Sequence, residues 1–259
     1  MAEHPRLDAV LFDAGGTLVR IDFEWISAML AELGLTVSAA DVRAAEVLGR
    51  RRYDSSTATG ATRPVATPQG LHPPLGSTGD TMAYFSGMLE GAGVRHPVLE
   101  EALHRMVERG RPPTYLWGRA MEGAREAIDG LLALGLRTAC VSNSDGRAER
   151  HLIDCGVREG LEFVVDSQVV GIEKPDPRIF ALALRQLGVP PERALYVGDI
   201  RSVDERGAEA AGMAFVLVDA SGSYAAAGAP RIGGLAELPA HVAQRFDLSH
   251  LQPPSMRRS

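Results

Sequence analysis

Residues 8–16 read DAVLFDAGG, a short apolar run that ends in Asp13 and a pair of glycines. An apolar run of this length that stops at glycines is typical of a buried strand that emerges into a loop. In open parallel sheets, ligands bind outside the carboxyl ends of the strands. The stretch therefore predicts a strand at residues 8–13 and places Asp13 where functional residues gather.

Strands and helices are expected to alternate in the second half of the chain. Apolar runs lie at 136–142, 161–166, 194–198 and 213–219, and helical patterns at 121–134, 147–155, 177–188 and 203–211. Alternation of elements this short requires a parallel sheet that is covered by helices on both faces. Together with the strand at 8–13, these elements predict an α/β core.

Helical patterns interrupt this core after its first strand. Apolar residues recur at steps of three and four residues over 22–52, and further helical patterns follow at 79–92 and 97–110. Residues 54–79 are rich in Ser, Thr, Gly and Pro, so we expect a long flexible loop there. We divide the chain into a discontinuous core of residues 1–20 and 112–259 and a helical insertion of residues 21–111.

The composition limits the partners and the compartment. The 259 residues include 27 basic and 33 acidic side chains, a net charge of −6, which argues against nucleic acid and anionic membranes as partners. The chain shows neither a signal peptide nor an apolar run of about 18 residues. Cys140 and Cys155 lack metal-ligand spacing and are too few for a disulfide framework. We expect a cytoplasmic protein, and the sequence does not determine its oligomeric state.

Several polar residues follow the expected strands or lie in the loops beside them. They are Asp13, Ser142, Asn143, Lys174, Asp199 and Asp204. Because the carboxyl ends of parallel strands share one edge of a sheet, we expect these side chains to converge. Three carboxylates side by side and away from water need a cation between them. Mg²⁺, a hard cation that prefers oxygen ligands, suits three aspartates without histidine or cysteine.

Lys174 is the only lysine among the 27 basic residues, since the other 26 are arginine. Such a bias is typical of a GC-rich genome, but a compact ammonium and a planar guanidinium are not interchangeable at a tight site. This contrast favours a functional role for Lys174. Each residue also has an ordinary interpretation when it is taken singly: Asp13 as a turn residue, Asp199 as a helix cap, and Lys174 as a solvated loop charge.

Four segments resemble, in order, the four motifs of the haloacid dehalogenase (HAD) superfamily. They are FDAGGTL (12–18), VSNSDG (141–146), GIEKPDPRIF (171–180) and YVGDIRSVDERGAEAAGM (196–213). They are most similar to the subfamily in which a helical cap follows the first motif. The resemblance implies a Rossmann-like parallel-sheet core with an inserted all-helical cap domain. It also implies a Mg²⁺-dependent phosphatase, a phosphoric monoester hydrolase, that acts on a small phosphorylated metabolite.

The resemblance further implies a role for each matching residue. Asp13 is the implied nucleophile, which forms an aspartyl-phosphate. Thr17, Ser142 and the backbone around Asn143 are implied to bind the phosphoryl oxygens, and Lys174 to neutralise the charge that nucleophile and phosphate share.

The implied metal ligands are Asp13, Asp199 and Asp204, the last directly or through water, together with the backbone carbonyl of Gly15. Gly15 is also where the chain departs from the family pattern. Phosphatases of this family carry an aspartate at this position, two residues after the nucleophile, as general acid and base. Gly15 keeps the carbonyl but has no proton to transfer, and such transfer is worth roughly 10²–10⁴ in rate.

Three consequences of Gly15 remain open. The cap supplies a substitute proton carrier, for which His72, Asp80 and His96 are the candidates. Alternatively, the substrate has a good leaving group, such as an acyl or aryl phosphate. In the third case the chain is a catalytically weak or non-enzymatic protein that binds phosphate and Mg²⁺.

A different enzyme class, 2-haloacid dehalogenase, is a further alternative, because those relatives also lack the aspartate. They lack the acidic fourth motif too, whereas Asp199 and Asp204 are present here and would repel a carboxylate substrate in the absence of a metal. Phosphonate-cleaving relatives need a lysine in the cap, and this cap contains none.

Overall fold

The structure of the protein is a computed structural model that describes residues 4–58, 81–111, 113–220, 222, 224, 228 and 230–251. The chain forms two compact units. One, the α/β unit, consists of Met1–Arg20 and Ala120–Ser259, and the other, the helical unit, consists of Ile21–Arg119. The small strands β2 (Val19–Arg20) and β3 (Arg119–Ala120) pair in a sheet of their own where the chain passes between the units.

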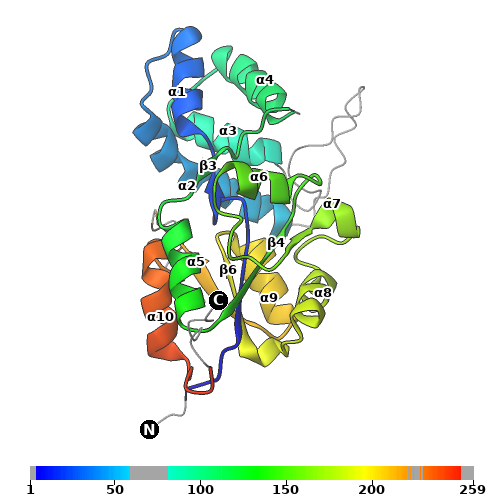
Figure 1. Ribbon diagram of the computed structural model, residues 1–259. Helices are drawn as coiled ribbons and strands as arrows, with labels where there is room; N and C mark the ends of the chain where they lie inside the picture. Colours follow the sequence, from blue (N-terminus) through cyan, green and yellow to red (C-terminus); the bar gives the residue numbers. More distant parts are fainter. Residues whose placement is uncertain are drawn as a thin grey trace. The chain divides into compact units, whose positions relative to one another are not determined.

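The α/β unit is built on a six-stranded sheet with the order β5-β4-β1-β6-β7-β8, in which every neighbouring pair is parallel (Figure 1). The strands are β1 (Ala9–Phe12), β4 (Arg137–Ser142), β5 (Val164–Asp166), β6 (Ala194–Gly198), β7 (Ala214–Val218) and β8 (Arg231–Ile232). The expected α/β class with a Rossmann-like parallel sheet is therefore confirmed. Because β1 is central, the residue that follows it lies beside the ends of β4 and β6.

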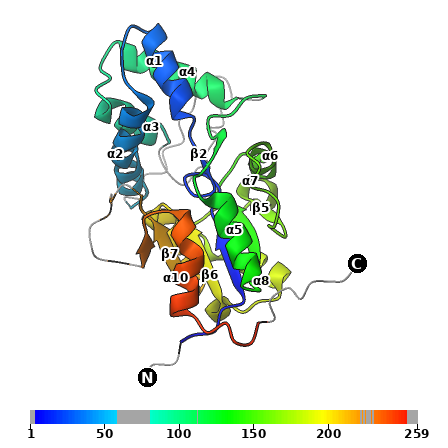
Figure 2. The same ribbon diagram turned by 60° about the vertical axis from the view of Figure 1, so that its left-hand side comes forward.

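Helices cover both faces of this sheet. They are α5 (Ala124–Ala133), α6 (Ala148–Asp154), α7 (Ser167–Val170), α8 (Pro177–Leu187), α9 (Arg206–Ala210) and α10 (Leu238–Arg245). In Figures 1 and 2, α5 and α10 lie together on one side of the sheet, and in Figure 1, α8 and α9 lie on the other. Leu11, Phe180 and Tyr196 belong to the buried core on the α8 side. The helix expected at 203–211 instead starts as a wide π turn, Arg201–Glu205, before α9.

Local sequence signals determine the ends of α8, which follows the Lys174 loop. The Asp176 side chain caps the helix by accepting a hydrogen bond from the backbone N–H of Arg178, and Pro177 occupies the first turn. Gly188 ends the helix with φ +64°, a conformation that glycine adopts without steric cost. These signals fix where the helix starts and thus where the preceding loop ends.

The helical unit contains α1 (Phe23–Glu32), α2 (Ala39–Ala58), α3 (Thr81–Gly91) and α4 (Val98–Gly110). The single helical pattern expected over 22–52 is split into α1 and α2, because Gly34 takes φ +84° and ends the first helix. Within the described ranges, none of the helices combines the length and apolar character required to span a bilayer.

Two boundaries of the helical unit differ from the sequence expectation. Helix α2 continues to Ala58, so residues 54–58 are helical instead of forming part of the long loop, whose remainder, 59–79, lies outside the described residues. The chain returns to the α/β unit at Ala120 instead of 112. The reason is that Leu116 accepts a hydrogen bond from the Asp22 backbone and Trp117 packs on Phe85, both within the helical unit.

Helices α2 and α3 pack closely through glycines. A Cβ atom at Gly49 would lie 2.6 Å from the backbone oxygen of Tyr84, and one at Gly87 would lie 2.9 Å from that of Leu48. Backbone atoms on the facing helix do not move aside as a flexible side chain does. The two glycines therefore set the distance between the helices.

Gly49→Ala is expected to lower the free energy of unfolding by about 1–3 kcal/mol, because overpacking outweighs the better helix propensity of alanine. Urea unfolding measures this loss. Arg51→Ala, at an exposed position of the same helix, is the control and should be nearly neutral. Equal or greater stability of Gly49→Ala would contradict the packing argument.

Candidate active site

The end of β1 brings three carboxylates together in the α/β unit. Oxygen atoms of Asp13, Asp199 and Asp204 lie within 4.8 Å of one another, and all three side chains are buried. Asp13 directly follows β1, and its backbone N–H donates to the carbonyl of Val197 on β6 at 2.9 Å. Asp199 directly follows β6. The expected convergence at one edge of the sheet is therefore present in the structure.

Asp204 bends back onto the end of β6. Its Oδ2 accepts hydrogen bonds from the backbone N–H groups of Asp199 at 3.1 Å and Ile200 at 3.0 Å. Gly198 permits this approach, because a Cβ atom there would lie 2.5 Å from the Asp204 Cγ. Asp204 lies within the π turn Arg201–Glu205, which directly follows Asp199 and Ile200.

Gly16 and Thr17 lie against Asp199. A Cβ atom at Gly16 would lie 2.3 Å from the Asp199 Oδ2, and the backbone there has φ +81°, so only glycine fits. The fully buried Thr17 hydroxyl lies 3.4 Å from the Asp199 Oδ1. Gly15 precedes them and pairs with Val19 in an isolated bridge. Gly16 thus permits the close approach of the backbone to the Asp199 carboxylate.

Lys174 holds the cluster from the loop before α8. Its side chain is 1% exposed, and its Nζ donates to the Oδ1 atoms of Asp13 at 2.7 Å and Asp204 at 2.8 Å. A third hydrogen bond from Nζ reaches the Tyr196 hydroxyl at 2.9 Å. The sole lysine of the chain is thus a buried ion-pair partner and not a solvated loop charge.

Asn143 uses its side chain to hold the backbone of Lys174. Its Oδ1 accepts from the Lys174 N–H at 2.8 Å, and its Nδ2 donates to the Lys174 carbonyl at 2.9 Å. The family resemblance implies phosphate binding by the backbone around Asn143. It does not predict the contact between the Asn143 side chain and the Lys174 backbone. Ser142, also buried, lies beside it with its hydroxyl 3.5 Å from the Asn143 carbonyl, a distance too long for a strong hydrogen bond.

The electrostatics of the cluster call for added positive charge. Burial raises the pKa of Asp13 to about 6, the ammonium of Lys174 opposes this shift, and the carboxylate of Asp204 adds to it. Burial lowers the pKa of Lys174, but Asp13 and Asp204 outweigh burial and hold that pKa above its ordinary value. The cluster contains three carboxylates and one ammonium. It therefore has the excess negative charge and the oxygen ligands that suit Mg²⁺.

The candidate proton carriers His72, Asp80 and His96 belong to the insertion, and only His96 is among the described residues. His72 and Asp80 lie outside the part of the chain that the structure describes. His96 belongs to the helical unit, where its side chain is 68% exposed and lies 3.5 Å from the Glu100 carboxylate.

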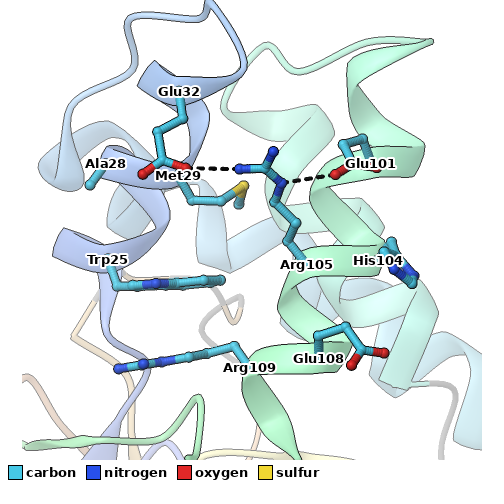
Figure 3. A pocket seen from close by; sticks show the side chains of 9 residues that line it. All are labelled: Trp25, Ala28, Met29, Glu32, Glu101, His104, Arg105, Glu108 and Arg109. Atoms are coloured by element: carbon cyan, nitrogen blue, oxygen red, sulfur yellow. Dashed lines mark hydrogen bonds and ion pairs between the residues drawn. The ribbon is translucent and has the colours of Figure 1, made fainter.

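The helical unit has a groove of its own between α1 and α4 (Figure 3). Arg105 bridges the two helices, donating to Glu32 at 2.9 Å and Glu101 at 2.8 Å. The Arg109 guanidinium stacks over Trp25 at 5.3 Å from the ring centroid. The contacts of Arg105 with Glu32 and of Arg109 with Trp25 join α1 to α4 along the groove.

Residues 7–212 match the family model of haloacid dehalogenase-like hydrolases. The chain belongs to this family. Haloacid dehalogenase-like hydrolase domain-containing protein 3 of Mus musculus is 43% identical over 107 residues, 41% of this chain and 42% of that protein. Phosphoserine phosphatase of Thermus thermophilus is 43% identical over 129 residues, 50% of this chain and 49% of that protein. The chain therefore spans about half the length of these curated relatives or less.

Solved structures share the fold of this HAD-family hydrolase. A dehalogenase superposes with a TM-score of 0.59 at 22% identity and covers 92% of this chain and 97% of its own. A HAD phosphatase from Thermococcus onnurineus superposes with a TM-score of 0.53 at 19% identity, covering 91% of this chain and 97% of its own. Phosphatases and dehalogenases both have this architecture, so the fold alone does not select the reaction.

The raised pKa of Asp13 gives a stability prediction. Because the folded, metal-free protein binds this proton more tightly than the unfolded chain does, its free energy of unfolding should fall as the pH rises from about 4 through about 6. Asp13→Asn removes the titration and should be more stable than the wild type at pH 7.5 by on the order of 2 kcal/mol. At pH 4 the difference should vanish.

Urea unfolding in the presence of a chelator at both pH values measures this difference. Asp129→Asn, which removes an exposed carboxylate of α5, is the matched control and should shift stability little at either pH. Added Mg²⁺ should stabilise the wild type more than Asp13→Asn, because a ligand that binds only the folded state adds to its stability. An Asp13→Asn protein that is less stable than the wild type at pH 7.5 would refute the electrostatic account.

Proposed function

We propose that the protein is a cytoplasmic Mg²⁺-dependent phosphoric monoester hydrolase that acts on a small phosphorylated metabolite, with the α/β unit as its core and the helical unit as its cap. The observation that carries the proposal is the Lys174 ammonium, which bridges Asp13 and Asp204 at 2.7 and 2.8 Å. An ammonium beside a buried carboxylate nucleophile is the arrangement that phosphoryl transfer needs. The buried free thiol of Cys140 agrees with a reducing compartment.

The names of partial relatives support this substrate class. Phosphoserine phosphatase of Thermus thermophilus is one, and glyceraldehyde 3-phosphate phosphatase of Methanopyrus kandleri, 49% identical over 67 residues, is another. Their names describe phosphate esters of small molecules. We place the substrate of this chain in the same broad class and leave its identity to experiment.

The proposed reaction uses Asp13 as the nucleophile. A carboxylate oxygen of Asp13 attacks phosphorus, the ester P–O bond breaks, and the departing alcohol oxygen takes up a proton. Water then attacks the aspartyl-phosphate, which releases inorganic phosphate and regenerates the carboxylate. Lys174 stabilises the negative charge in both steps, while Thr17, Ser142 and the backbone at Asn143 bind the phosphoryl oxygens.

The residues proposed to hold Mg²⁺ are Asp13, Asp199, Asp204 and the backbone carbonyl of Gly15. Both oxygens of Asp204 already accept hydrogen bonds, from Lys174 and from the backbone of Asp199 and Ile200. Asp204 is proposed to join the metal site directly or through water, and its hydrogen bonds also hold the loop after β6. Bound Mg²⁺ supplies positive charge that offsets the charge of the phosphoryl oxygens.

Gly15 limits the proton transfers of this reaction. It has no side chain to give a proton to the leaving alcohol or to take one from water. A substrate with a good leaving group needs no acid in the first step, and solvent or a group of the cap must serve the second. Gly15 also favours a second candidate function, a phosphate-binding protein of low turnover.

The Asp13 assignment predicts that Asp13→Asn abolishes Mg²⁺-dependent hydrolysis of p-nitrophenyl phosphate, with a loss of at least about 10³-fold. Release of p-nitrophenol measures it. Asp129→Asn serves as the control and should retain wild-type activity. Equal release by wild type and Asp13→Asn would overturn the hydrolase proposal. Phosphate or vanadate binding without turnover would then support the phosphate-binding alternative.

Gly15→Asp is expected to raise kcat by roughly 10²-fold on an alkyl phosphate, because it restores an acid and base for the leaving group and for water. The backbone at Gly15, unlike that of Gly16, lies outside the left-handed region, so an aspartate fits its conformation. The gain on p-nitrophenyl phosphate should be smaller, since p-nitrophenol leaves without an acid. If Gly15→Asp and the wild type have the same kcat on the alkyl phosphate, and also the same kcat on p-nitrophenyl phosphate, the proton carrier lies elsewhere.

A further inference from the structure

The hydroxyl of Tyr196 lies inside the α/β unit between the sheet and the active-site lysine. Tyr196 is on β6 and is fully buried. Its hydroxyl donates to the backbone carbonyl of Val141 on β4 at 2.7 Å and accepts from the Lys174 Nζ at 2.9 Å. We propose that Tyr196 is a positioning residue that fixes the direction of the Lys174 ammonium.

The direction of these hydrogen bonds follows from the chemistry of the groups. An ammonium is only a donor and a backbone carbonyl is only an acceptor, whereas a phenol has one hydrogen to give. The Tyr196 hydroxyl therefore gives its hydrogen to Val141 and turns a lone pair to Lys174. The hydrogen bond to the Val141 carbonyl sets the direction of this lone pair, and Val141 belongs to β4 of the sheet.

The contact between Lys174 and Tyr196 is a hydrogen bond and not a cation–π interaction. The Nζ atom lies 2.9 Å from the hydroxyl oxygen but 5.4 Å from the ring centroid, so it lies beyond the hydroxyl end of the ring. The contact therefore depends on one oxygen atom. Replacing tyrosine by phenylalanine removes that atom and keeps the ring.

The third acceptor determines how the ammonium is held. Two of the Nζ hydrogens point to Asp13 and Asp204, and the third points to Tyr196. Without the hydroxyl, a buried N–H would lose its acceptor, and the ammonium would turn about the two remaining contacts or shift toward them. Because Asp13 is the proposed nucleophile, such a shift changes the charge beside the reacting oxygen.

The surrounding structure holds both ends of this contact. The Tyr196 ring packs edge-on against Phe180 at 4.9 Å and stacks with Phe215 at 6.4 Å between centroids. Asn143 fixes the Lys174 peptide on both sides. The lysine is thus anchored at its backbone by Asn143 and at its tip by Tyr196. Tyr196 acts through Lys174 and does not itself meet the substrate.

Because the chain has a single lysine, ¹⁵Nζ-lysine labelling gives one side-chain nitrogen signal, that of Lys174. In Tyr196→Phe we expect this signal to shift and its ammonium protons to exchange with water at least about tenfold faster. Tyr84→Phe is the matched control, because it removes another buried tyrosine hydroxyl, bonded to Glu46 in the helical unit. It should leave the Lys174 signal unchanged.

The kinetic part of the test rests on the proposed function. With p-nitrophenyl phosphate and Mg²⁺, Tyr196→Phe should lower kcat roughly tenfold per folded protein and change KM less than about threefold, since the ammonium stabilises the developing charge. Tyr84→Phe should match the wild type. Loss of folded protein alone would lower the apparent kcat without moving the nitrogen signal.

An unchanged nitrogen signal and proton exchange rate in Tyr196→Phe would overturn the proposal, whatever the activity. A shifted signal in a protein without turnover would support the positioning role and contradict the proposed hydrolase. In case Tyr196→Phe does not fold, the wild type itself gives a test. Its Lys174 ammonium protons should show nuclear Overhauser effects to the Tyr196 ring, and their absence would also overturn the proposal.

Discussion

The burial of one ammonium among three carboxylates is the constraint on which the α/β unit depends. Lys174 is almost fully buried, and a charge removed from water is tolerated only where its hydrogen bonds and its countercharges are provided. Asp13 follows the end of β1, and Asp204 lies in the turn after β6. The cluster therefore exists only when these two strands are neighbours. The sheet order, with β1 between β4 and β6, meets this condition. The remaining excess of negative charge is what makes the site suitable for a cation.

Close packing of backbone around the carboxylates is the second requirement. A side chain at Gly16 or Gly198 would collide with these carboxylates. A Cβ atom at Gly16 would lie 2.3 Å from Asp199, and one at Gly198 would lie 2.5 Å from Asp204. The helix that follows β6 starts as a π turn, Arg201–Glu205, which contains Asp204. Such departures from a regular helix are frequent at functional sites.

Much of the sheet follows from periodicity, because buried parallel strands are short apolar runs. The run at 194–198 coincides with β6, and the run at 213–219 differs from β7 by one residue at each end. Long-range effects account for the departures. Helical periodicity continues through Gly34, yet its left-handed φ separates α1 from α2. The strand β8 has only two residues, too few for a pattern to reveal, and it forms through pairing with β7.

The candidate site was predictable as a set of positions but not as a set of contacts. Motif order brings Asp13, Lys174 and Asp204 together, whereas the use of the Asn143 side chain on the Lys174 peptide depends on loops that only the folded sheet makes adjacent. Tyr196 carried one weak signal, a hydroxyl in the otherwise apolar strand ALYVG. That hydroxyl helps to explain the single lysine. Three acceptors surround one nitrogen at 2.7 to 2.9 Å, which suits a tetrahedral ammonium, whereas a planar guanidinium spreads its donors over three nitrogens and would not fit them.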